Sequence, residues 1–505
     1  MKTIQYFVAA FFLFTITSCE LVREDYTEIY PENFFQTEKD LELAVNALYT
    51  TFSPAYTNEN IGLYGPGNKG YQIFSEMTTD ALWCTWGWEW DELHFQQWYA
   101  TIGGNMASII WDAYAKYNFL SKARNTIRRI ERSSVSEEVK KKYMAEAKAL
   151  MGWMGLVTYD LFGPVPVAPD EVLDDPQKFV YLPRLAEEEY DLFMEHNLTE
   201  AAEHLPEKVS ARGRMTKGAA RMILLKYYMI KGYFDKAETL ARELLSMEGS
   251  VYTLHPDYNF LFSKAGNGNS EMILQIATNL TNNPNLMIAH IVPGDYPLGV
   301  DKAEVWGAYV MPWAFYDTFE TGDKRLQRIV ASYVNVKGEL MEREKDGNLK
   351  KGSIPLKFGV DPDQIGTNTG LDIPVYRFAD VLLSLAECIT RNQGQPIHEA
   401  IDLVNRVRNR AGLPNLSSDV TSSRELFEEA ILMERGHEFY MEGLRRQDLI
   451  RFGKYVEKAN ERIDAINMAE GRGYFHAHEG HTRFWIPQWY IDESKGAVKQ
   501  NNYSR

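Results

Sequence analysis

The stretch TKGAARMILLKYYMIKGYFDKAETLARELLSM, residues 216–247, decides the fold. Thr216 can cap a helix that carries Leu224 and Tyr228 on its inner face, and Gly232 is placed to end that helix. A second helix follows, and the small and apolar residues on its inner face are Ala237, Leu240, Ala241 and Leu244. Small residues where the two helices approach closely predict an antiparallel helical hairpin.

The spacing of this hairpin resembles a tetratricopeptide repeat, whose helical pairs must stack on neighbours to bury their apolar faces. A degenerate second copy is predicted over residues 375–412, where Pro396 opens the second helix. Apolar stripes near residues 41, 113, 150 and 190 would supply the neighbours. The expected fold class is therefore mainly α, a tetratricopeptide-like scaffold of helical hairpins (an α/α superhelix) with loop-rich insertions and a few short strands.

The chain divides into a short leader and one long domain. Residues 1–18 are the predicted lipoprotein signal peptide, and residues 19–505 are expected to form a single domain. The helical scaffold should cover about residues 37–248 and 374–460. Residues 250–372 are rich in Asn, Gly, Pro and aromatic side chains, which predicts an irregular insertion with a few strands. Long ordered loops on a rigid scaffold are the usual location of a binding site.

The first residues have the pattern of a secretory signal. Lys2 precedes an apolar run, Tyr6–Ile16, which is about half the length that a membrane-spanning helix needs. The run ends in Ile-Thr-Ser-Cys at residues 16–19, which is similar to the lipobox of bacterial lipoproteins. This similarity predicts cleavage before Cys19 and acylation of its thiol, which would anchor the domain to a membrane. The alternative is a plain signal peptide with an incidental cysteine.

The composition excludes several classes of function. The chain has 45% hydrophobic and 25% charged residues, which is typical of a globular protein. A formal net charge of -16 argues against binding of nucleic acid. Beyond Cys19 only Cys84 and Cys388 remain, so neither a disulfide framework nor a four-thiolate metal site can form. The 11 Trp and 29 Tyr residues are many rings for a polar protein, and such rings suit interfaces and sugar faces.

The densest aromatic segment, residues 80–98, contains the first candidate ligand-binding residues. Sugar recognition needs flat rings against the C–H face of a pyranose, and polar side chains for its hydroxyls. If the segment is extended, alternation places Trp86, Trp88 and Trp90 on one face. The alternative is a tryptophan-rich plug between repeats. The candidates here are Asp80, Trp83, Trp86, Trp88 and Trp90, and a second group in the insertion comprises Tyr296, Trp306 and Trp313.

Charged clusters elsewhere favour structural roles. Between Glu434 and Arg451, acids and arginines recur at helical spacing, which predicts a network of ion pairs rather than a catalytic group. The spacing of acidic residues within 361–372 resembles a calcium-binding loop, but Ile365 occupies a position that needs an oxygen ligand. The three histidines within residues 476–481 are more typical of a polar surface than of a metal site. We therefore expect no metal and no cofactor.

The sequence contains no G-x-S-x-G, P-loop or H-E-x-x-H motif, and Cys388 lies on an apolar helical stripe, as a core thiol would. We therefore expect that the protein is not an enzyme. A glycoside hydrolase stays open as an alternative, because its pair of carboxylates is set by their separation in space and leaves no short sequence mark.

Five blocks along the chain resemble the SusD/RagB family of nutrient-binding lipoproteins of the Bacteroidota outer membrane. The first is Trp111-Asp112-Ala113-Tyr114, and the last runs from Glu434 to Gly453. The blocks between them are residues 145–150 with 159–166, residues 374–387, and residues 405–413. The chain departs from the family pattern at Asn502-Tyr503-Ser504, because members of the family usually end in Gly-Tyr.

This resemblance implies a lipid-anchored protein exposed on the cell surface, with a loop-rich ligand face on a helical scaffold. It implies capture of a glycan for nutrient uptake and polysaccharide utilization. The implied partner is a SusC-like TonB-dependent outer-membrane barrel, over which the protein would sit as a hinged lid. Glu20, Glu24 and Asp25 look like the family's surface-export signal. A second hypothesis is a scaffold that binds a peptide on its concave helical surface, with the tryptophans used for packing.

Overall fold

The computed structural model describes most of the chain between Phe34 and Asn501. The described residues are 34–54, 62–67, 70–98, 105–175, 180–343, 345 and 347–501. The predicted signal peptide, the lipidation site at Cys19 and the acidic residues after it lie outside these ranges. Among the described residues, no helix combines the length and hydropathy that a membrane crossing requires.

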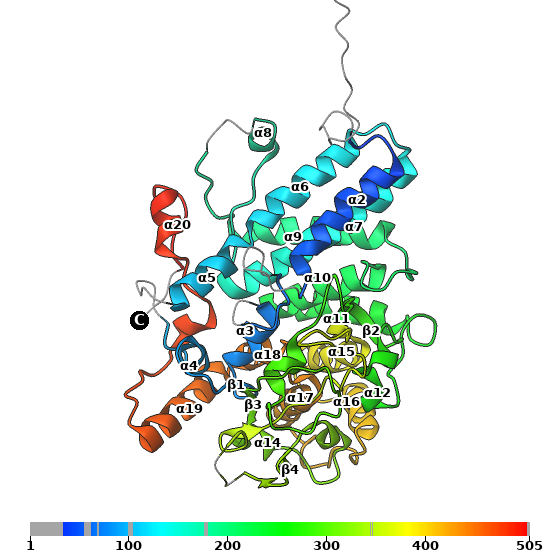
Figure 1. The fold of residues 1–505 in the computed structure, drawn as a ribbon. Coiled ribbons are helices and arrows are strands. Elements are labelled where there is room, and N and C mark those ends of the chain that lie inside the picture. The colour runs from blue at the N-terminus through cyan, green and yellow to red at the C-terminus, as the bar shows by residue number, and fades with distance from the viewer. Residues whose placement is uncertain are drawn as a thin grey trace, which may run out of the picture.

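A stack of paired helices makes up the first half of the fold (Figure 1). Its members are α2 (Glu38–Tyr49), α5 (Asn105–Ala115), α6 (Asn118–Glu131), α7 (Glu137–Phe162), α9 (Glu187–His204), α10 (Lys217–Lys231) and α11 (Phe234–Leu245). The second half contributes α15 (Phe378–Gln393), α16 (His398–Arg410), α17 (Arg424–Phe439), α18 (Arg445–Arg451), α19 (Tyr455–Glu470) and α20 (Gln488–Glu493).

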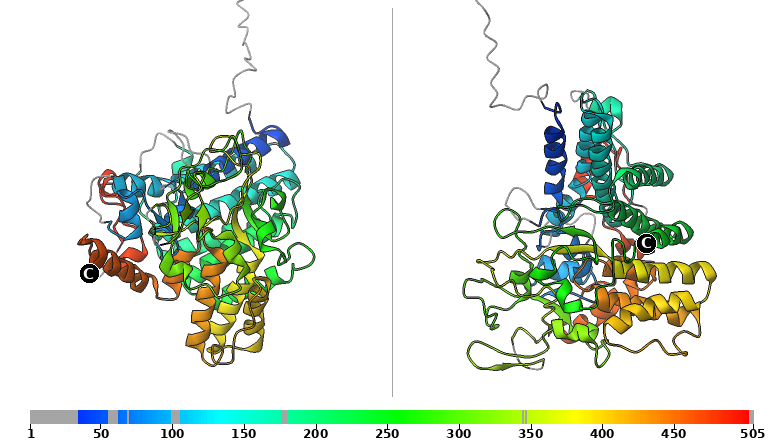
Figure 2. Two further views of the ribbon diagram at one scale, coloured as in Figure 1. Left: turned by 60° about the horizontal axis from the view of Figure 1, so that its bottom comes forward. Right: turned by 90° about the vertical axis from the view of Figure 1, so that its right-hand side faces the viewer.

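The two halves form one continuous stack of helices. The helices pack as successive neighbours in the order α6, α7, α9, α10, α11, α15 and α16. The right-hand view of Figure 2 shows α10 and α11 in green beside α15 and α16 in yellow. The fold is therefore mainly α-helical, as the sequence predicts. One hydrophobic core runs through the stack and includes residues from Leu41 to Val498.

The hairpin of residues 216–247 forms as predicted. The hydroxyl of Thr216 accepts a hydrogen bond from the Ala219 N–H at the start of α10. Gly232 ends that helix with a φ of 76°, a left-handed conformation that costs glycine little. The predicted second copy is partly wrong, because Val375 lies in a strand and the helix begins only at Phe378. This strand pairs with the insertion, and tertiary pairing outweighs the helical spacing of its apolar residues.

Two glycines on α7 bring α9 into close contact. A Cβ atom on Gly152 would lie 2.5 Å from Cδ2 of Leu198, and one on Gly155 would lie 2.6 Å from Sδ of Met194. Both partner side chains lie on α9 and are fully buried. The absence of side chains at these two positions therefore sets the spacing of the helix pair.

The insertion contributes most of the short strands. Those described are β1 (Trp83–Cys84), β2 (Met272–Ile276), β3 (Tyr309–Pro312), β4 (Tyr333–Val334), β5 (Leu340–Met341), β6 (Gly352–Ser353) and β7 (Ile373–Arg377). Within the described ranges they pair antiparallel as a sheet in the order β1-β3-β6 and as the pairs β2-β7 and β4-β5. The β1-β3 pairing joins the tryptophan-rich segment near residue 83 to the insertion.

Short helices connect these elements. The α-helical ones are α3 (Tyr71–Met77), α4 (Glu89–His94), α8 (Asp170–Leu173), α12 (Tyr258–Leu261), α13 (Met287–Ile291) and α14 (Trp313–Tyr316). Single 3-10 turns are η1 (Thr50–Phe52), η2 (Lys264–Gly266), η3 (Lys324–Arg328) and η4 (Glu479–Thr482).

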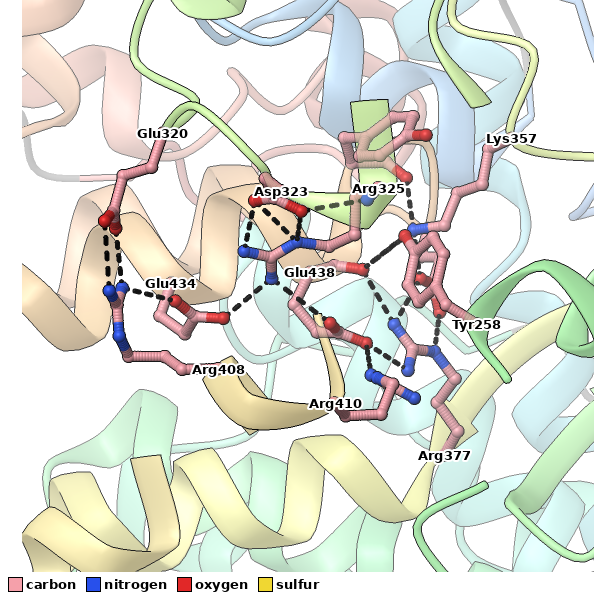
Figure 3. A network of polar contacts seen from close by, with 12 residues as sticks. Tyr258, Glu320, Asp323, Arg325, Lys357, Arg377, Arg408, Arg410, Glu434 and Glu438 are labelled. Carbon is pink, nitrogen blue, oxygen red and sulfur yellow. Dashed lines mark hydrogen bonds and ion pairs between the residues drawn. The ribbon is translucent and has the colours of Figure 1, made fainter. Parts of the chain in front are cut away.

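A buried ion-pair network ties the insertion to the scaffold (Figure 3). Glu438 on α17 is fully buried and pairs with Arg325 at 3.3 Å, with Arg377 at 2.5 Å and with Arg410. Arg377 also binds Glu442, with its Nε 2.8 Å from a carboxylate oxygen. Burial alone would raise the pKa of Glu438, but the guanidinium groups of Arg410, Arg377 and Arg325 outweigh it and lower that pKa. The ion-pair network predicted between Glu434 and Arg451 is thus confirmed.

The ion-pair network also includes residues outside the segment from Glu434 to Arg451. Arg325 lies in the insertion, and its guanidinium binds Asp323 and Glu434 at 2.7 Å each. At the other end of the block, Arg435 bridges Asp380 at 2.8 Å and Asp448 at 2.9 Å. The partners come from several elements, so the ion pairs fix how these elements dock against one another.

A buried carboxyl on α3 makes stability depend on pH. Burial raises the pKa of Glu76 to about 7, while a hydrogen bond from the Gly443 N–H at 2.7 Å partly offsets the effect. Because the folded pKa lies above the unfolded one, Glu76 lowers stability as pH rises from about 4.5 to about 7. We expect Glu76→Gln to stabilise the protein at pH 8, by up to about 3 kcal/mol, and to change nothing at pH 4. Thermal unfolding of both proteins at pH 4, 6 and 8 measures this, and a difference independent of pH would contradict it.

Candidate functional site

The tryptophan-rich segment forms a tight turn and not the extended strand that the alternation predicts. The strand β1 ends at Cys84, and α4 begins at Glu89. Between them Gly87 has a φ of 86° and Trp88 has a φ of 50°. A left-handed conformation is costly for a bulky residue such as Trp88, so the surrounding structure must hold it.

The turn separates the three rings that were expected to share one face. Trp86 is 40% exposed and Trp88 is 78% exposed, whereas Trp90 is buried. The Trp90 ring lies beneath the surface, 6.0 Å from the Trp86 ring centroid and 5.5 Å from that of Tyr309. Trp90 therefore packs in the core, and the prediction of a shared face is wrong because helix α4 has already begun there.

A further exposed indole belongs to a turn of the insertion. The N–H groups of Trp306 and Gly307 both donate to the carbonyl of Ala289, at 2.7 Å and 3.1 Å. Gly307 has a φ of 73°, and a Cβ atom there would lie 2.9 Å from Cα of Pro293. The turn leaves Trp306 45% exposed, and its indole N–H donates to a carboxylate oxygen of Glu304 at 3.0 Å.

The β1-β3 pairing brings the two turns together. Cys84 pairs with Tyr309, and the N–H of Thr85 donates to the carbonyl of Ala308 at 2.9 Å. His290 lies between the indoles, with its ring centroid 5.8 Å from that of Trp86 and 5.1 Å from that of Trp306. We call Trp86, His290 and Trp306 the aromatic platform. Trp88 lies two residues after Trp86 and is more exposed than either indole of the platform.

The platform is uncharged except at its edge. Burial lowers the pKa of His290, so its imidazole is neutral at pH 7. The Glu304 carboxylate that holds Trp306 keeps lone pairs for further hydrogen bonds. Flat rings beside an acceptor suit a ligand with both C–H faces and hydroxyl groups.

The remaining candidates lie away from the platform. The Trp83 ring is buried, stacks on His94 at 5.2 Å and donates its N–H to Asp91 at 3.0 Å. Asp80 forms a two-pronged ion pair with Arg445, with both contacts at 2.9 Å.

Two candidates from the insertion also make internal contacts. Trp313 is buried, donates to the carbonyl of Leu349 at 2.8 Å and lies under the guanidinium of Arg343. Tyr296 is half-buried, and its ring packs 5.1 Å from that of Tyr333. Sequence reasoning missed His290, because a lone histidine in the apolar run of α13 is typical of a core residue.

The two segments that the sequence suggests as possible metal sites, residues 361–372 and 476–481, form hydrogen bonds and ion pairs within the protein. The Asp361 carboxylate binds Lys264 at 3.0 Å and accepts the N–H of Gly370 at 2.6 Å. His476 pairs with Asp464 at 2.6 Å. Burial lowers the pKa of His481 to about 4. Among the described residues, no three His, Cys, Asp or Glu side chains gather in a way that could hold a metal ion.

Comparisons with known proteins match this architecture. The model of the SusD family matches residues 270–503. A SusD-like protein of Bacteroides ovatus is 26% identical over 451 residues, which cover 84% of this chain and 77% of the relative. The crystal structure of a SusD homologue from Bacteroides thetaiotaomicron has a TM-score of 0.77 at 19% identity, over 94% of this chain and 99% of that chain. Surface glycan-binding protein A of Bacteroides thetaiotaomicron, in complex with laminarihexaose, has a TM-score of 0.73 at 22% identity, over 92% and 99%.

The fold and the site define a class of protein: a scaffold of stacked helical hairpins whose loop-rich side carries exposed indole rings. Sequence and structure matches show what the chain is similar to. Residues 270–503 match the model of the SusD family, the chain is similar in sequence to SusD-like proteins, and its fold is that of the solved SusD homologues.

Proposed function

We propose that this protein binds a glycan at the cell surface and delivers it to a SusC-like TonB-dependent transporter of the outer membrane. The observation that carries the proposal is the aromatic platform, in which Trp86 and Trp306 stay about half exposed on either side of His290. The turn after Trp86 also holds Trp88 at a φ of 50°, and strained backbone of this kind clusters at ligand sites. The relative solved with laminarihexaose supports an oligosaccharide as the ligand class.

The proposal includes a lipid anchor and no catalysis. Acylation at Cys19 would tether the folded body to the outer membrane, exposed to the outside. The described polar clusters are engaged in ion pairs that dock elements against one another, which suits a binding role. Mass spectrometry of detergent-extracted protein should find diacylated or triacylated Cys19, and Cys19→Ser should release the protein from membranes. An unmodified thiol in the mature wild-type protein would refute the anchor.

A panel of polysaccharides tests the binding function. The protein without residues 1–19 is run in native gels that contain laminarin, starch, xylan, mannan or pectin, and reducing ends are measured in parallel. We expect retardation by at least one polysaccharide and no release of product. Retardation by none would refute the proposed function, and product release by pure protein would make the protein a hydrolase. Copurification of a large β-barrel with the full-length protein tests the transporter partner.

The turn that holds Trp306 offers a finer test. Gly307→Ala adds a Cβ atom that meets the backbone of Pro293 at 2.9 Å, so the turn must shift. We expect about tenfold weaker glycan binding and a loss of stability of about 1–3 kcal/mol, measured by titration calorimetry and thermal unfolding. Gly299→Ala is the matched control, because Gly299 also has a positive φ, 78°, but no atom within 4 Å of the added Cβ. Equal glycan affinity of Gly307→Ala and wild type would contradict the role of this turn.

A further inference from the structure

A second group of exposed aromatic rings lies on α5 and α20, and none of its residues belongs to the aromatic platform. Trp111 on α5 is 39% exposed and Trp489 on α20 is 51% exposed. Their ring centroids are 6.0 Å apart in an edge-to-face arrangement. Tyr490 contacts both, at 6.0 Å from Trp111 and 5.0 Å from Trp489. Figure 1 shows α5 and α20 on the same flank of the molecule as α4, and α4 contacts α5.

Contacts with buried residues and with the backbone fix the position of these rings. Tyr490 packs against the fully buried ring of Tyr114 at 4.9 Å. The segment before α20 is fixed to the scaffold, because the Phe484 N–H donates to the carbonyl of Leu161 at 2.7 Å. Gln500 closes the segment after α20 by two hydrogen bonds with the backbone of Ile486, at 2.8 Å and 2.9 Å. The indoles are therefore presented on an ordered support, which lowers the entropic cost of binding.

A hollow of about 250 Å³ lies beside the rings. Tyr117 and Tyr490 belong both to the ring group and to the wall of the hollow. Its polar lining includes Asn118, Ser121 and Glu493. Pockets for drug-sized ligands measure roughly 300–1,000 Å³, so a hollow of this size suits a single sugar ring. Hydroxyl, amide and carboxylate groups offer both donors and acceptors for sugar hydroxyls.

The surroundings favour a sugar over a protein partner. The centre of a protein interface is depleted of charged residues. Here Asp492 and Glu493 follow Trp489 on the same short helix, and both are exposed. An indole beside acidic and hydroxyl groups matches the chemistry of a carbohydrate site.

We propose that Trp111, Trp489 and the hollow beside Tyr490 form a second carbohydrate-binding site, which holds one pyranose ring of a longer glycan. The ligand class rests on the proposed function of the aromatic platform. Two sites on one polymer raise its overall affinity without any new contact, because the second binding step becomes intramolecular. The second site would thus select long polysaccharides over short oligosaccharides.

Fluorine NMR of protein labelled with 5-fluorotryptophan tests the second site residue by residue. Single Trp→Phe substitutions assign the resonances of Trp86, Trp306, Trp111 and Trp489. Laminarin, starch, xylan, mannan and pectin are then added in turn. We expect the glycan that shifts the Trp86 and Trp306 resonances to shift those of Trp111 and Trp489 too. The latter two should still shift in Trp86→Ala/Trp306→Ala.

Affinity measurements supply the controls. Trp489→Ala should weaken binding of the polysaccharide at least threefold, leave binding of its hexasaccharide at the platform unchanged, and be rescued by Trp489→Tyr. Met468→Ala, at an exposed apolar residue of α19, should change neither affinity.

Three outcomes would overturn the second site. One is that the Trp111 and Trp489 resonances stay fixed while glycan saturates Trp86. Another is that they move with protein concentration instead, which would indicate contact between copies of the chain. The last is that no tryptophan responds to any of the five polysaccharides, which would remove the proposed function as well. If Trp86 and Trp306 stay silent while Trp111 and Trp489 respond, the second site stands and the platform does not.

Discussion

The variant Trp86→Ala/Trp306→Ala is expected to lose all measurable binding of a hexasaccharide at the aromatic platform while it keeps its fold. Both indoles are about half exposed and meet at His290, so they can cover the face of a sugar ring together. Aromatic residues at the centre of a binding site commonly contribute about 2 kcal/mol or more, so each single substitution should weaken binding at least about 30-fold. Titration calorimetry with a hexasaccharide of the polysaccharide that retards the protein in native gels measures the loss.

Two further substitutions separate binding from folding. Trp90→Ala removes a buried ring and should cost about 3–5 kcal/mol of stability, so it cannot report on binding alone. Trp88→Ala removes an exposed ring that is not part of the core. Its effect on glycan affinity therefore shows whether Trp88 also contacts the glycan. Unchanged affinity of a stably folded Trp86→Ala/Trp306→Ala protein would refute the platform as the glycan site.

Glu438→Ala is expected to destabilise the protein by about 3–5 kcal/mol, because it leaves buried guanidinium groups without a carboxylate. Arg325, Arg377 and Arg410 all pair with Glu438, and all four side chains are buried. The pKa of Glu438 is lowered in the folded protein, so its contribution is present above about pH 4.5 and is lost as pH falls. Thermal and urea unfolding at pH 7 measure the loss.

A surface ion pair provides the matched control for Glu438. Glu399 pairs with Arg242 at 2.7 Å, and both side chains are exposed to solvent. Glu399→Ala should cost less than about 1 kcal/mol, because water screens the pair. Equal unfolding midpoints for Glu438→Ala and Glu399→Ala would contradict the structural role of the buried network.

The helices were the most predictable part of this fold. Thr216, Gly232 and the apolar spacing between them act within one or two helical turns, so the sequence pattern indicates them directly. The error at Val375 has the opposite cause. That residue lies in β7, which pairs with β2 about a hundred residues earlier in the chain, and no local pattern reports such pairing.

The candidate site was predictable only in part. The density of tryptophans in residues 80–98 marked Trp86 and Trp88 as candidates, and its position in the insertion marked Trp306. The structure leaves all three exposed. The positive φ angles of Gly87 and Trp88 break the alternation, so Trp90 turns into the core. Only the tertiary structure shows that His290 belongs to the platform, because its ring contacts Trp86 and Trp306 from two different turns.

The sequence by itself determined that the chain folds as a stack of helical hairpins with an irregular, aromatic-rich insertion, because helical periodicity and capping depend on neighbours a few residues apart. The tertiary structure alone decided which indoles face solvent and which meet. Trp86 and Trp306 both contact His290 because β1 pairs with β3, and Trp111 meets Trp489 because α20 docks on α5. Contacts between distant segments arise from burial and pairing across the whole fold, and these are properties that no single stretch of sequence carries.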